Sequence, residues 1–206
     1  CLSRRDVGAK LSIDTRKAKI MLRAAECGAE LINDSSGTCD GRLAADPDNA
    51  GADDQTLAVL ASRHDLSYCA MHMHGTPKTM QLDPLRGDAA VVSVDQFFQA
   101  AHKRLANAGF SKKRLWFDPG VGFGKDDSGN LAVLAHVPTW SKSLPIGVGI
   151  SRKGFIGRAL NIPVPEQRDA PSKMLELGLA IAGAGLIRTH DVTRLARLRN
   201  LLAGGH

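Results

Sequence analysis

The stretch "RLWFDPGVGFGK" (residues 114–125) is an apolar run that ends on a charge and is followed by a turn rich in glycine and proline. Glycine lets the backbone adopt positive φ angles or approach a ligand closely, at a cost in folding entropy. A plain connecting loop needs neither Asp118 nor Lys125. The stretch therefore predicts a buried strand whose carboxyl end carries a functional turn.

The same pattern recurs along the whole chain. Short apolar runs alternate with segments of helical period, which is typical of parallel strands joined by helices. Six strands are predicted, over residues 10–14, 29–34, 66–73, 114–120, 144–151 and 184–190. The helix before the fifth strand is expected to be short, about residues 130–136, and a last helix should cover about residues 192–202.

Every predicted strand ends in polar or charged residues. They are Asp14, Asn33, Asp34, His72, Asp118, Ser151, Arg152, Lys153, Arg188 and His190. Strands of a parallel sheet are buried on both faces, so charges belong at their ends. The carboxyl ends are where (β/α) barrels and open doubly wound sheets build their sites. We expect an α/β fold of the TIM (β/α)8 barrel type, with about six of the eight units in a single domain over residues 1–206.

Composition favours small anions as partners. The 206 residues include 27 Lys and Arg against 21 Asp and Glu, a net charge of +6. The basic residues are scattered and only 4% of residues are aromatic, so we expect no nucleic acid partner. No apolar run approaches the ~20 residues of a membrane span, and no signal peptide opens the chain. We expect a cytoplasmic protein with no membrane partner and with reduced cysteines, because the four cysteines show no CxxC spacing.

The acidic strand ends suggest recognition of a heterocycle. Carboxylates accept from ring N–H and amino groups, while an amide both donates and accepts, so Asp14, Asn33, Asp34 and Asp118 together could bind the edge of a nitrogen-rich ring. The alternative for each is a helix N-cap. For Asp34 we favour a structural hydrogen bond within its own turn.

The basic strand ends suggest recognition of phosphate. "SRKGFIG" (151–157) lies on the second-last strand, where barrels often bind phosphate, and "RTHD" adds Arg188 and His190 on the last. Arginine binds phosphate bidentately and lysine acts as a point charge. Side chains alternate across a strand, so we expect Arg152 to point away and to form a structural ion pair.

"MHMHGTPKTMQ" (71–81) allows a metal in principle, because His72 and His74 share a strand face, but no third ligand lies nearby in the sequence. Met71 suits packing against a flat ring, and Met73 suits the core. The predicted loops 35–51 and 74–88 are long enough to favour a functional role.

Six motifs in this order resemble the dihydropteroate synthase family of pterin-binding enzymes, which sulfonamides inhibit: "SIDTRKA", "LINDSSG", "MHMHGTPKTMQ", "FDPGVGFGK", "GISRKGFIG" and "IRTHDV". The match runs from about Lys10 to the last helix. The resemblance implies a transferase of folate biosynthesis that condenses 6-hydroxymethyl-7,8-dihydropterin pyrophosphate with p-aminobenzoate and releases pyrophosphate. It also implies Mg²⁺ as cofactor and a homodimer formed through the last helices.

The resemblance also implies residue roles. The pterin-binding residues would be Asp14, Asn33, Met71, Asp118, Phe123, Gly149 and Lys153; the p-aminobenzoate site would include Ser151 and Lys153; pyrophosphate would be bound by Arg188 and His190. Among these, the catalytic residues would be Asp14, Asp118 and Lys153. If the C–O bond breaks before the amine attacks, carboxylates stabilise the cationic methylene group. We expect carboxylates and cations on opposite walls of the site.

Members of that family carry two further βα units before this region, including the metal-binding motif. We therefore expect an N-terminally incomplete barrel with two open edges, no metal ligand in this chain, and poor activity unless another segment completes it. The alternatives are a pterin-dependent methyltransferase, which has no use for Lys153, Arg188 and His190, and a non-catalytic pterin-binding remnant.

Overall fold

A computed structural model describes residues 9–39 and 51–202. Its strands are β1 (Ser12–Thr15), β2 (Leu31–Asp34), β3 (Ser67–Met71), β4 (Leu115–Asp118), β5 (Gly147–Gly149) and β6 (Leu186–Arg188). All six predicted strands are therefore present. The predicted loop 35–51 falls in part on residues 40–50, which lie outside the described residues.

The strands are parallel and follow one another in space as in sequence. β1 to β4 form one sheet, β5 pairs with β6, and a parallel bridge between Phe117 and Ile146 joins the two sets. Within the described residues no pairing joins β1 to β6, so these two strands are the edges of an open array. This is the arrangement predicted for six successive units of a (β/α) barrel.

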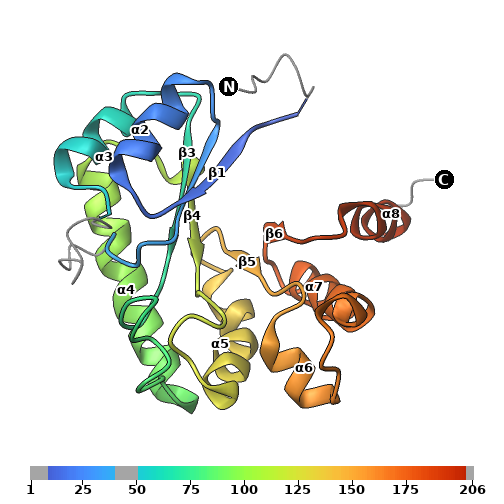
Figure 1. Cartoon of the computed structure of the whole chain (residues 1–206). Coiled ribbons are helices and arrows are strands. Elements are labelled where there is room, and N and C mark those ends of the chain that lie inside the picture. The colour runs from blue at the N-terminus through green and yellow to red at the C-terminus, as the bar shows by residue number, and fades with distance from the viewer. Residues whose placement is uncertain (1–8, 40–50, 203–206) are drawn as a thin grey trace.

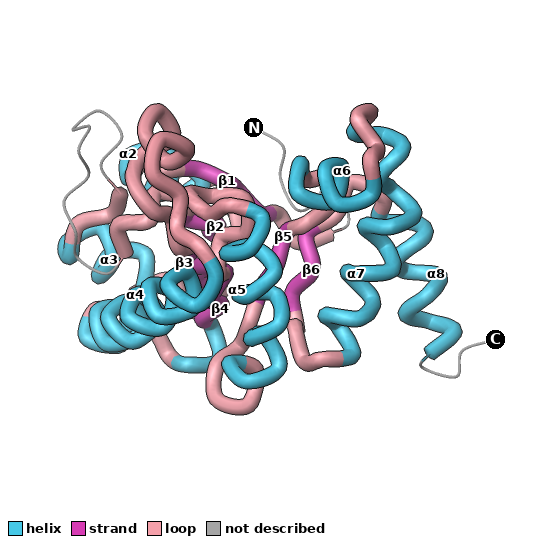
Figure 2. Tube along the Cα trace, turned by 90° about the horizontal axis from the view of Figure 1, so that it is seen from below, coloured by secondary structure: helices cyan, strands magenta, loops and turns pink. Residues whose placement is uncertain are grey.

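Helices cover the outer side of the strands (Figures 1 and 2). They are α2 (Ala18–Glu26), α3 (Asp54–Ala61), α4 (Gly87–Asn107), α5 (Asp127–Trp140), α6 (Gly154–Leu160), α7 (Asp169–Ile181) and α8 (Val192–Leu202), with 3₁₀ turns at Lys112–Arg114 and Pro165–Arg168. In Figure 2 α7 lies between β6 and α8. The last helix has the predicted bounds.

The core lies between β1–β4 and the helices α3 to α5. Phe117 on β4 is fully buried, and its ring meets Phe98 of α4 at 5.5 Å between centroids. Phe98 in turn meets Trp140 of α5 at 5.3 Å. Edge-to-face contacts of this kind add to the apolar area that each ring buries. β4, whose carboxyl end carries Asp118, is thus held from behind by an aromatic cluster.

Two helices differ from the sequence-based expectation. α5 has 14 residues rather than the predicted short segment, because Asp126 caps its start by accepting from the Gly129 amide at 2.8 Å and the helix continues past Pro138. α6, which was not among the predicted helices, follows Lys153 directly and ends at Asn161 in the left-handed conformation. The periodicity of apolar residues predicts neither the cap of α5 nor its continuation past a proline.

In the described residues Cys27, Cys39 and Cys69 form no disulfide. None of the helices in the described residues is long and apolar enough to cross a membrane.

Candidate functional site

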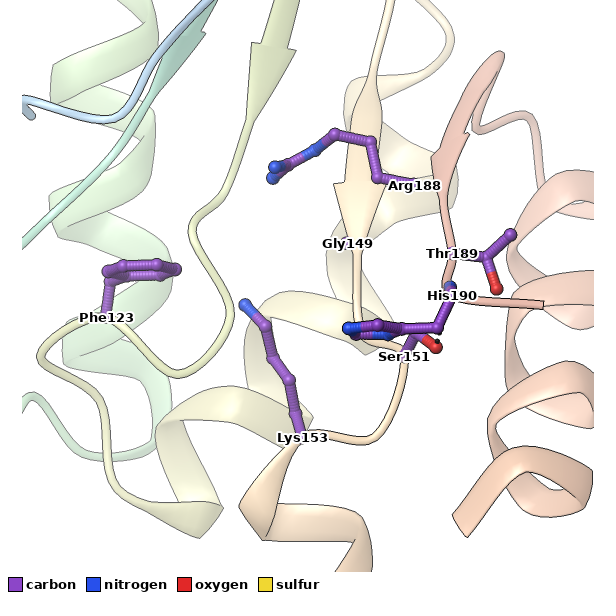
Figure 3. Close-up of a pocket in the computed structure, with 7 residues that line it drawn as sticks. All are labelled: Phe123, Gly149, Ser151, Lys153, Arg188, Thr189 and His190. Atoms are coloured by element: carbon purple, nitrogen blue, oxygen red, sulfur yellow. Dashed lines mark hydrogen bonds between the residues drawn. The ribbon is translucent and has the colours of Figure 1, made fainter. Parts of the chain in front are cut away.

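A cavity of about 270 Å³ opens at the carboxyl ends of β4, β5 and β6. Its lining residues are Phe123, Gly149, Ser151, Lys153, Arg188, Thr189 and His190. Figure 3 shows Arg188, from β6, and Lys153, from the start of α6, extending toward the side of the cavity on which the Phe123 ring lies. Six of the seven were named from the sequence; Thr189 was not. Its side chain points away from the cavity in Figure 3, toward α7.

Arg188 links the cavity to two of the predicted carboxylates. Its Nη2 donates to Oδ2 of Asp118 at 2.5 Å, and its Nη1 donates to Oδ2 of Asp14 at 3.1 Å. Gly149 permits this placement, because a Cβ there would lie 3.0 Å from Nη2 of Arg188. The expectation of carboxylates and cations on opposite walls was therefore wrong, because Arg188 donates a hydrogen bond to each of the two carboxylates.

The two carboxylates lie in different surroundings. The Asp118 side chain is 2% exposed and accepts from the Gly120 amide at 2.7 Å, whereas the Asp14 side chain is 55% exposed. Asp14 accepts from Nδ2 of Asn33 at 2.6 Å and from Oγ of Ser35 at 2.9 Å. The Oδ1 atom of buried Asn33 has no hydrogen-bond partner in the described structure. It is an acceptor available to a ligand N–H group.

Asp34 has the structural role favoured from the sequence. It is buried, accepts from the Ser36 amide at 2.9 Å, and accepts from the Tyr68 hydroxyl at 2.7 Å. Burial raises its pKa, and these hydrogen bonds oppose the rise. The alternative that the strand-end acids are N-caps was wrong, because the caps of α3 and α5 are Asp53 and Asp126.

The turn after β4 needs its glycines. Gly120 has φ +64°, and a Cβ there would lie 1.8 Å from the His72 carbonyl oxygen. Asn130 of α5 closes the turn from behind, with Oδ1 accepting from the Gly122 amide at 2.6 Å and Nδ2 donating to the Lys125 carbonyl at 3.2 Å. Sequence reasoning missed Asn130, which lies within the helix and offers no motif. The close approach that the opening stretch predicted is thus made to β3 and α5.

Lys125 is buried behind the same turn. Its Nζ donates to the carbonyl oxygens of Gly120 at 2.9 Å and Phe123 at 3.2 Å, and lies 2.8 Å from Nδ1 of His72. Burial lowers the pKa of Lys125 to about 7, while the Asp118 carboxylate opposes that shift. Nε2 of His72 lies 3.0 Å from Oγ of Ser93. Lys125 and His72 therefore fix the turn to β3.

Lys153 approaches the turn from the cavity side. Its Nζ donates to the Val121 carbonyl and lies 4.6 Å from the centroid of the Phe123 ring. Burial lowers the pKa of Lys153 to about 8, an effect opposed by the charge of Asp118. An ammonium in this setting is ready to bind a ligand oxygen or a π face.

The strand ends on the basic side are joined by hydrogen bonds. The His190 amide donates to Oγ of Ser151 at 3.2 Å. Arg152 turns away from the cavity and pairs with Asp169 through Nε at 2.7 Å and Nη2 at 2.9 Å, which confirms the predicted ion pair. Arg152 has φ +60°, a conformation that costs about 1–2 kcal/mol for a residue with a Cβ.

The methionines of "MHMH" lie in the interior. Met71, assigned by resemblance to the pterin pocket, is 1% exposed and pairs in register with Asp118. It does not line the cavity in this structure. Met73 is also buried, as predicted for a core residue.

Metal ligands do not cluster in the part of the chain that the structure describes. Nowhere in residues 9–39 and 51–202 do three His, Cys, Asp or Glu side chains lie together in a way that could hold an ion. The site instead combines Arg188, Lys153, His190 and an aromatic ring with two carboxylates and an amide. This arrangement suits a ligand that carries both an anionic group and a flat ring rich in N–H donors.

Comparison with known proteins identifies similar chains. The family model described as "Pterin binding enzyme" matches residues 2–190. Dihydropteroate synthase of Escherichia coli K12 is 37% identical over 183 residues, which cover 88% of this chain and 59% of that protein. The chain thus spans about three fifths of the length of that curated relative.

Solved structures give the same result. The dihydropteroate synthase of Thermus thermophilus in complex with 6HMPPP superposes with a TM-score of 0.82 at 31% identity, covering 97% of this chain and 74% of that one. The Yersinia pestis enzyme in a sulfonamide drug complex gives a TM-score of 0.78 at 35% identity, covering 95% and 66%.

Proposed function

The chain belongs to the pterin binding enzyme family, and from this we propose that it provides the pterin and pyrophosphate sites of a dihydropteroate synthase. The reaction would join 6-hydroxymethyl-7,8-dihydropterin pyrophosphate to p-aminobenzoate, giving 7,8-dihydropteroate and pyrophosphate in folate biosynthesis. The relatives of this chain that are named dihydropteroate synthase are transferases.

One observation carries the proposal. Arg188 lies between the cavity and the carboxylates of Asp14 and Asp118, and its buried Nε has no hydrogen-bond partner in the described structure. A guanidinium so placed contacts both halves of a ligand that has a donor-rich ring and an anionic tail. A site for a neutral heterocycle alone would not need Lys153 and His190 beside it.

We assign the ring to the acidic side of the site. Asp118, Asp14 and Asn33 would accept from pterin N–H groups, which replace the donors of Arg188 on the two carboxylates. Lys153 and Phe123 would border the ring, with Gly149 leaving room beside it. Met71 would support the pocket from the interior, since it lies beside Asp118 in the sheet.

We assign the pyrophosphate to the basic side. Arg188, once the ring displaces it from the carboxylates, would turn its free N–H groups to the phosphate oxygens, and His190 would provide a second contact. Ser151 and Lys153 would border the p-aminobenzoate. This exchange of partners would make the binding of the ring and of the anion cooperative.

The proposed chemistry follows from these charges. The C–O bond between the pterin methylene and pyrophosphate breaks, and its electron pair leaves with pyrophosphate toward Arg188 and His190. The carboxylates of Asp14 and Asp118 stabilise the positive methylene group. The amine nitrogen of p-aminobenzoate then forms the new C–N bond and loses one proton.

Mg²⁺ fits this scheme only in part. The described residues offer it no group of three ligands, so no step above depends on it. Magnesium is often bound by one or two carboxylates together with substrate phosphates. We propose that any requirement for Mg²⁺ arises with the pyrophosphate and that further ligands come from outside this chain.

We further propose a cytoplasmic homodimer that sulfonamides inhibit and that binds no nucleic acid. Support for the dimer comes from apolar side chains exposed on the last two helices. Met174 and Ile181 of α7 are 76% and 70% exposed, and Leu201 of α8 is 71% exposed. Sedimentation velocity over a range of protein concentrations tests this state.

Calorimetric titration of the chain tests the proposed function. We expect the pterin pyrophosphate to bind, and Asp118→Ala to weaken its binding by at least about tenfold, because the variant removes a buried acceptor. Titration with and without Mg²⁺ tests the cofactor. Thr38→Ala, on another segment and absent from the cavity lining, is the matched control.

The comparison ligand is the same pterin without pyrophosphate. Equal affinity for both ligands would contradict the pyrophosphate site and favour a pterin-dependent methyltransferase. Release of pyrophosphate on addition of p-aminobenzoate would show catalysis by this chain. Binding without release would identify a pterin-binding remnant.

A further inference from the structure

α7 buries a row of polar side chains, while several of its apolar side chains, such as Met174 and Ile181, are exposed. Ser172, Lys173 and Glu176 are at most 4% exposed, and the Asp169 side chain is 18% exposed. These four residues follow one another at spacings of three, one and three, so they lie on a single face of the helix. We call this face the α7 polar stripe.

The stripe contacts the fifth strand end through Arg152. Oγ of Ser172 accepts from the Arg152 amide at 3.1 Å, and Asp169 holds the Arg152 guanidinium through both carboxylate oxygens. Just before the helix, Arg168 donates from Nη1 to the Arg152 carbonyl at 2.9 Å. Arg152, which has a positive φ, is thus bonded through its amide, its carbonyl and its side chain to residues 168–172.

The stripe contacts the sixth strand end through Thr189. Nζ of Lys173 donates to Oγ1 of Thr189 and to Oε2 of Glu176, the latter at 2.9 Å. Thr189 points away from the cavity while its neighbours Arg188 and His190 line it (Figure 3). Fixing Thr189 on one side of the chain therefore fixes the direction of its two neighbours on the other.

We propose that the α7 polar stripe consists of positioning residues that hold Lys153 and Ser151 on one strand end and Arg188 and His190 on the other in the geometry that binds the anionic substrate group. This rests on the proposed function, which assigns those strand ends to ligands. An apolar helix face would pack against the strands without fixing the orientation of the strand ends, whereas charge-assisted hydrogen bonds fix that orientation. A solely structural helix would gain more from apolar side chains at these buried positions.

Three variants test the stripe. Ser172→Ala and Asp169→Asn remove its contacts to Arg152 with little change in shape. The double variant Lys173→Met with Glu176→Leu removes the contact to Thr189 without leaving a buried charge unpaired. Asp127→Asn is the matched control, because Asp127 also lies in the first turn of a helix and pairs with an arginine, Arg158, away from the cavity.

The first readout needs no ligand. We expect amide hydrogen exchange over residues 150–153 to rise about tenfold in Ser172→Ala and Asp169→Asn, and over residues 188–191 in the double variant, because each variant weakens the hydrogen bonding that holds its strand end. Asp127→Asn should leave the exchange rates of both segments unchanged. Asp169→Glu, which keeps the carboxylate, should keep the exchange rate over residues 150–153 near that of wild type. Unchanged exchange at both strand ends in all three variants overturns the proposal.

The second readout is the dissociation constant of inorganic pyrophosphate, measured by calorimetry. We expect a rise of about tenfold in the stripe variants and none in Asp127→Asn. Faster exchange with unchanged pyrophosphate affinity would overturn the positioning role. If the wild-type chain binds neither pyrophosphate nor pterin, the proposed function fails, and the exchange measurement alone still decides whether the stripe holds the strand ends.

Discussion

The two halves of the strand array fix their polar residues by different means. In β1 to β4 the acid Asp118 follows a strand packed against aromatic rings, and its side chain is 2% exposed. In β5 and β6 the strands have three residues each, and Arg188 is 30% exposed. Apolar packing holds the strand that carries Asp118, whereas hydrogen bonds from α7 hold Arg152 and Thr189, the neighbours of the basic residues. A site can thus combine a rigid wall with one that depends on polar contacts.

The largest expected effect on stability comes from a substitution in the packed half, β1 to β4. Phe117→Ala should lower the free energy of unfolding by about 3–5 kcal/mol, because it opens a cavity in the aromatic cluster. Ile187→Ala on half-buried β6 should cost no more than about 2 kcal/mol. Urea unfolding of both variants measures the contrast. Equal losses would show that β6 is packed as firmly as β4.

The next effect compares the two carboxylates that share Arg188. Asp118→Asn should cost about 2 kcal/mol of unfolding free energy, because a charged hydrogen bond in the interior is lost. Asp14→Asn should cost less than about 1 kcal/mol, since that side chain is 55% exposed and screened by solvent. Guanidinium chloride is itself a salt that screens charges, so urea is the suitable denaturant. A larger loss for Asp14→Asn would contradict the assigned difference in burial.

A pH series sharpens the comparison at Lys125. Its pKa is lowered to about 7 in the folded protein, so above pH 7 the unfolded chain binds more protons and stability rises with pH. Between pH 7.0 and 8.5 we expect this lysine to add about 1–2 kcal/mol. Urea midpoints should show a steeper slope for wild type than for Lys125→Met, in which Lys153, with its pKa lowered to about 8, leaves a smaller slope of the same sign.

Lys113→Met, on the exposed turn before β4, is the control for that series and should keep the wild-type slope. The series stops at pH 8.5 because of Cys69. Burial raises the pKa of its thiol in the folded protein, so at higher pH the thiol ionises in the unfolded chain first and the free energy of unfolding falls. A slope in Lys125→Met equal to that of wild type would assign the pH dependence to other groups.

The smallest effect lies on the surface. Arg158→Ala removes a bidentate pair with Asp127 in which both side chains are at least 45% exposed. We expect a loss below about 1 kcal/mol that shrinks further in added salt. Thermal unfolding at low and high salt checks this. A loss as large as that of Asp118→Asn would mean that exposure does not decide the strength of these pairs.

Much of this structure could be predicted from sequence because its signals are local. The six strands follow from apolar runs, and the polar ends of those strands lie together because parallel strands place their carboxyl ends at one edge. The ion pair of Arg152 was also predicted, although Arg152 lies in a turn beyond β5 with a positive φ and not in the strand whose alternation suggested it. The predictions of the strands and of their polar ends rest on neighbours within a few residues.

Contacts between distant segments could not be predicted. Lys125 meets His72 across 53 residues, and Arg188 meets Asp118 across 70. No period or motif encodes these pairs. The α7 polar stripe was missed for another reason: buried polar residues at helical spacing look like the solvent face of an amphipathic helix.

The order of the strands bears on how the chain folds during synthesis. Each strand pairs with the one made just before it, so β1 to β4 can assemble progressively as the polypeptide emerges, and contacts between near neighbours form fast. The pair of Asp14 and Arg188 joins residues 174 positions apart. It forms only after Arg188 has been translated, well after β1 to β4. The ligand site is therefore completed on a sheet that has already formed.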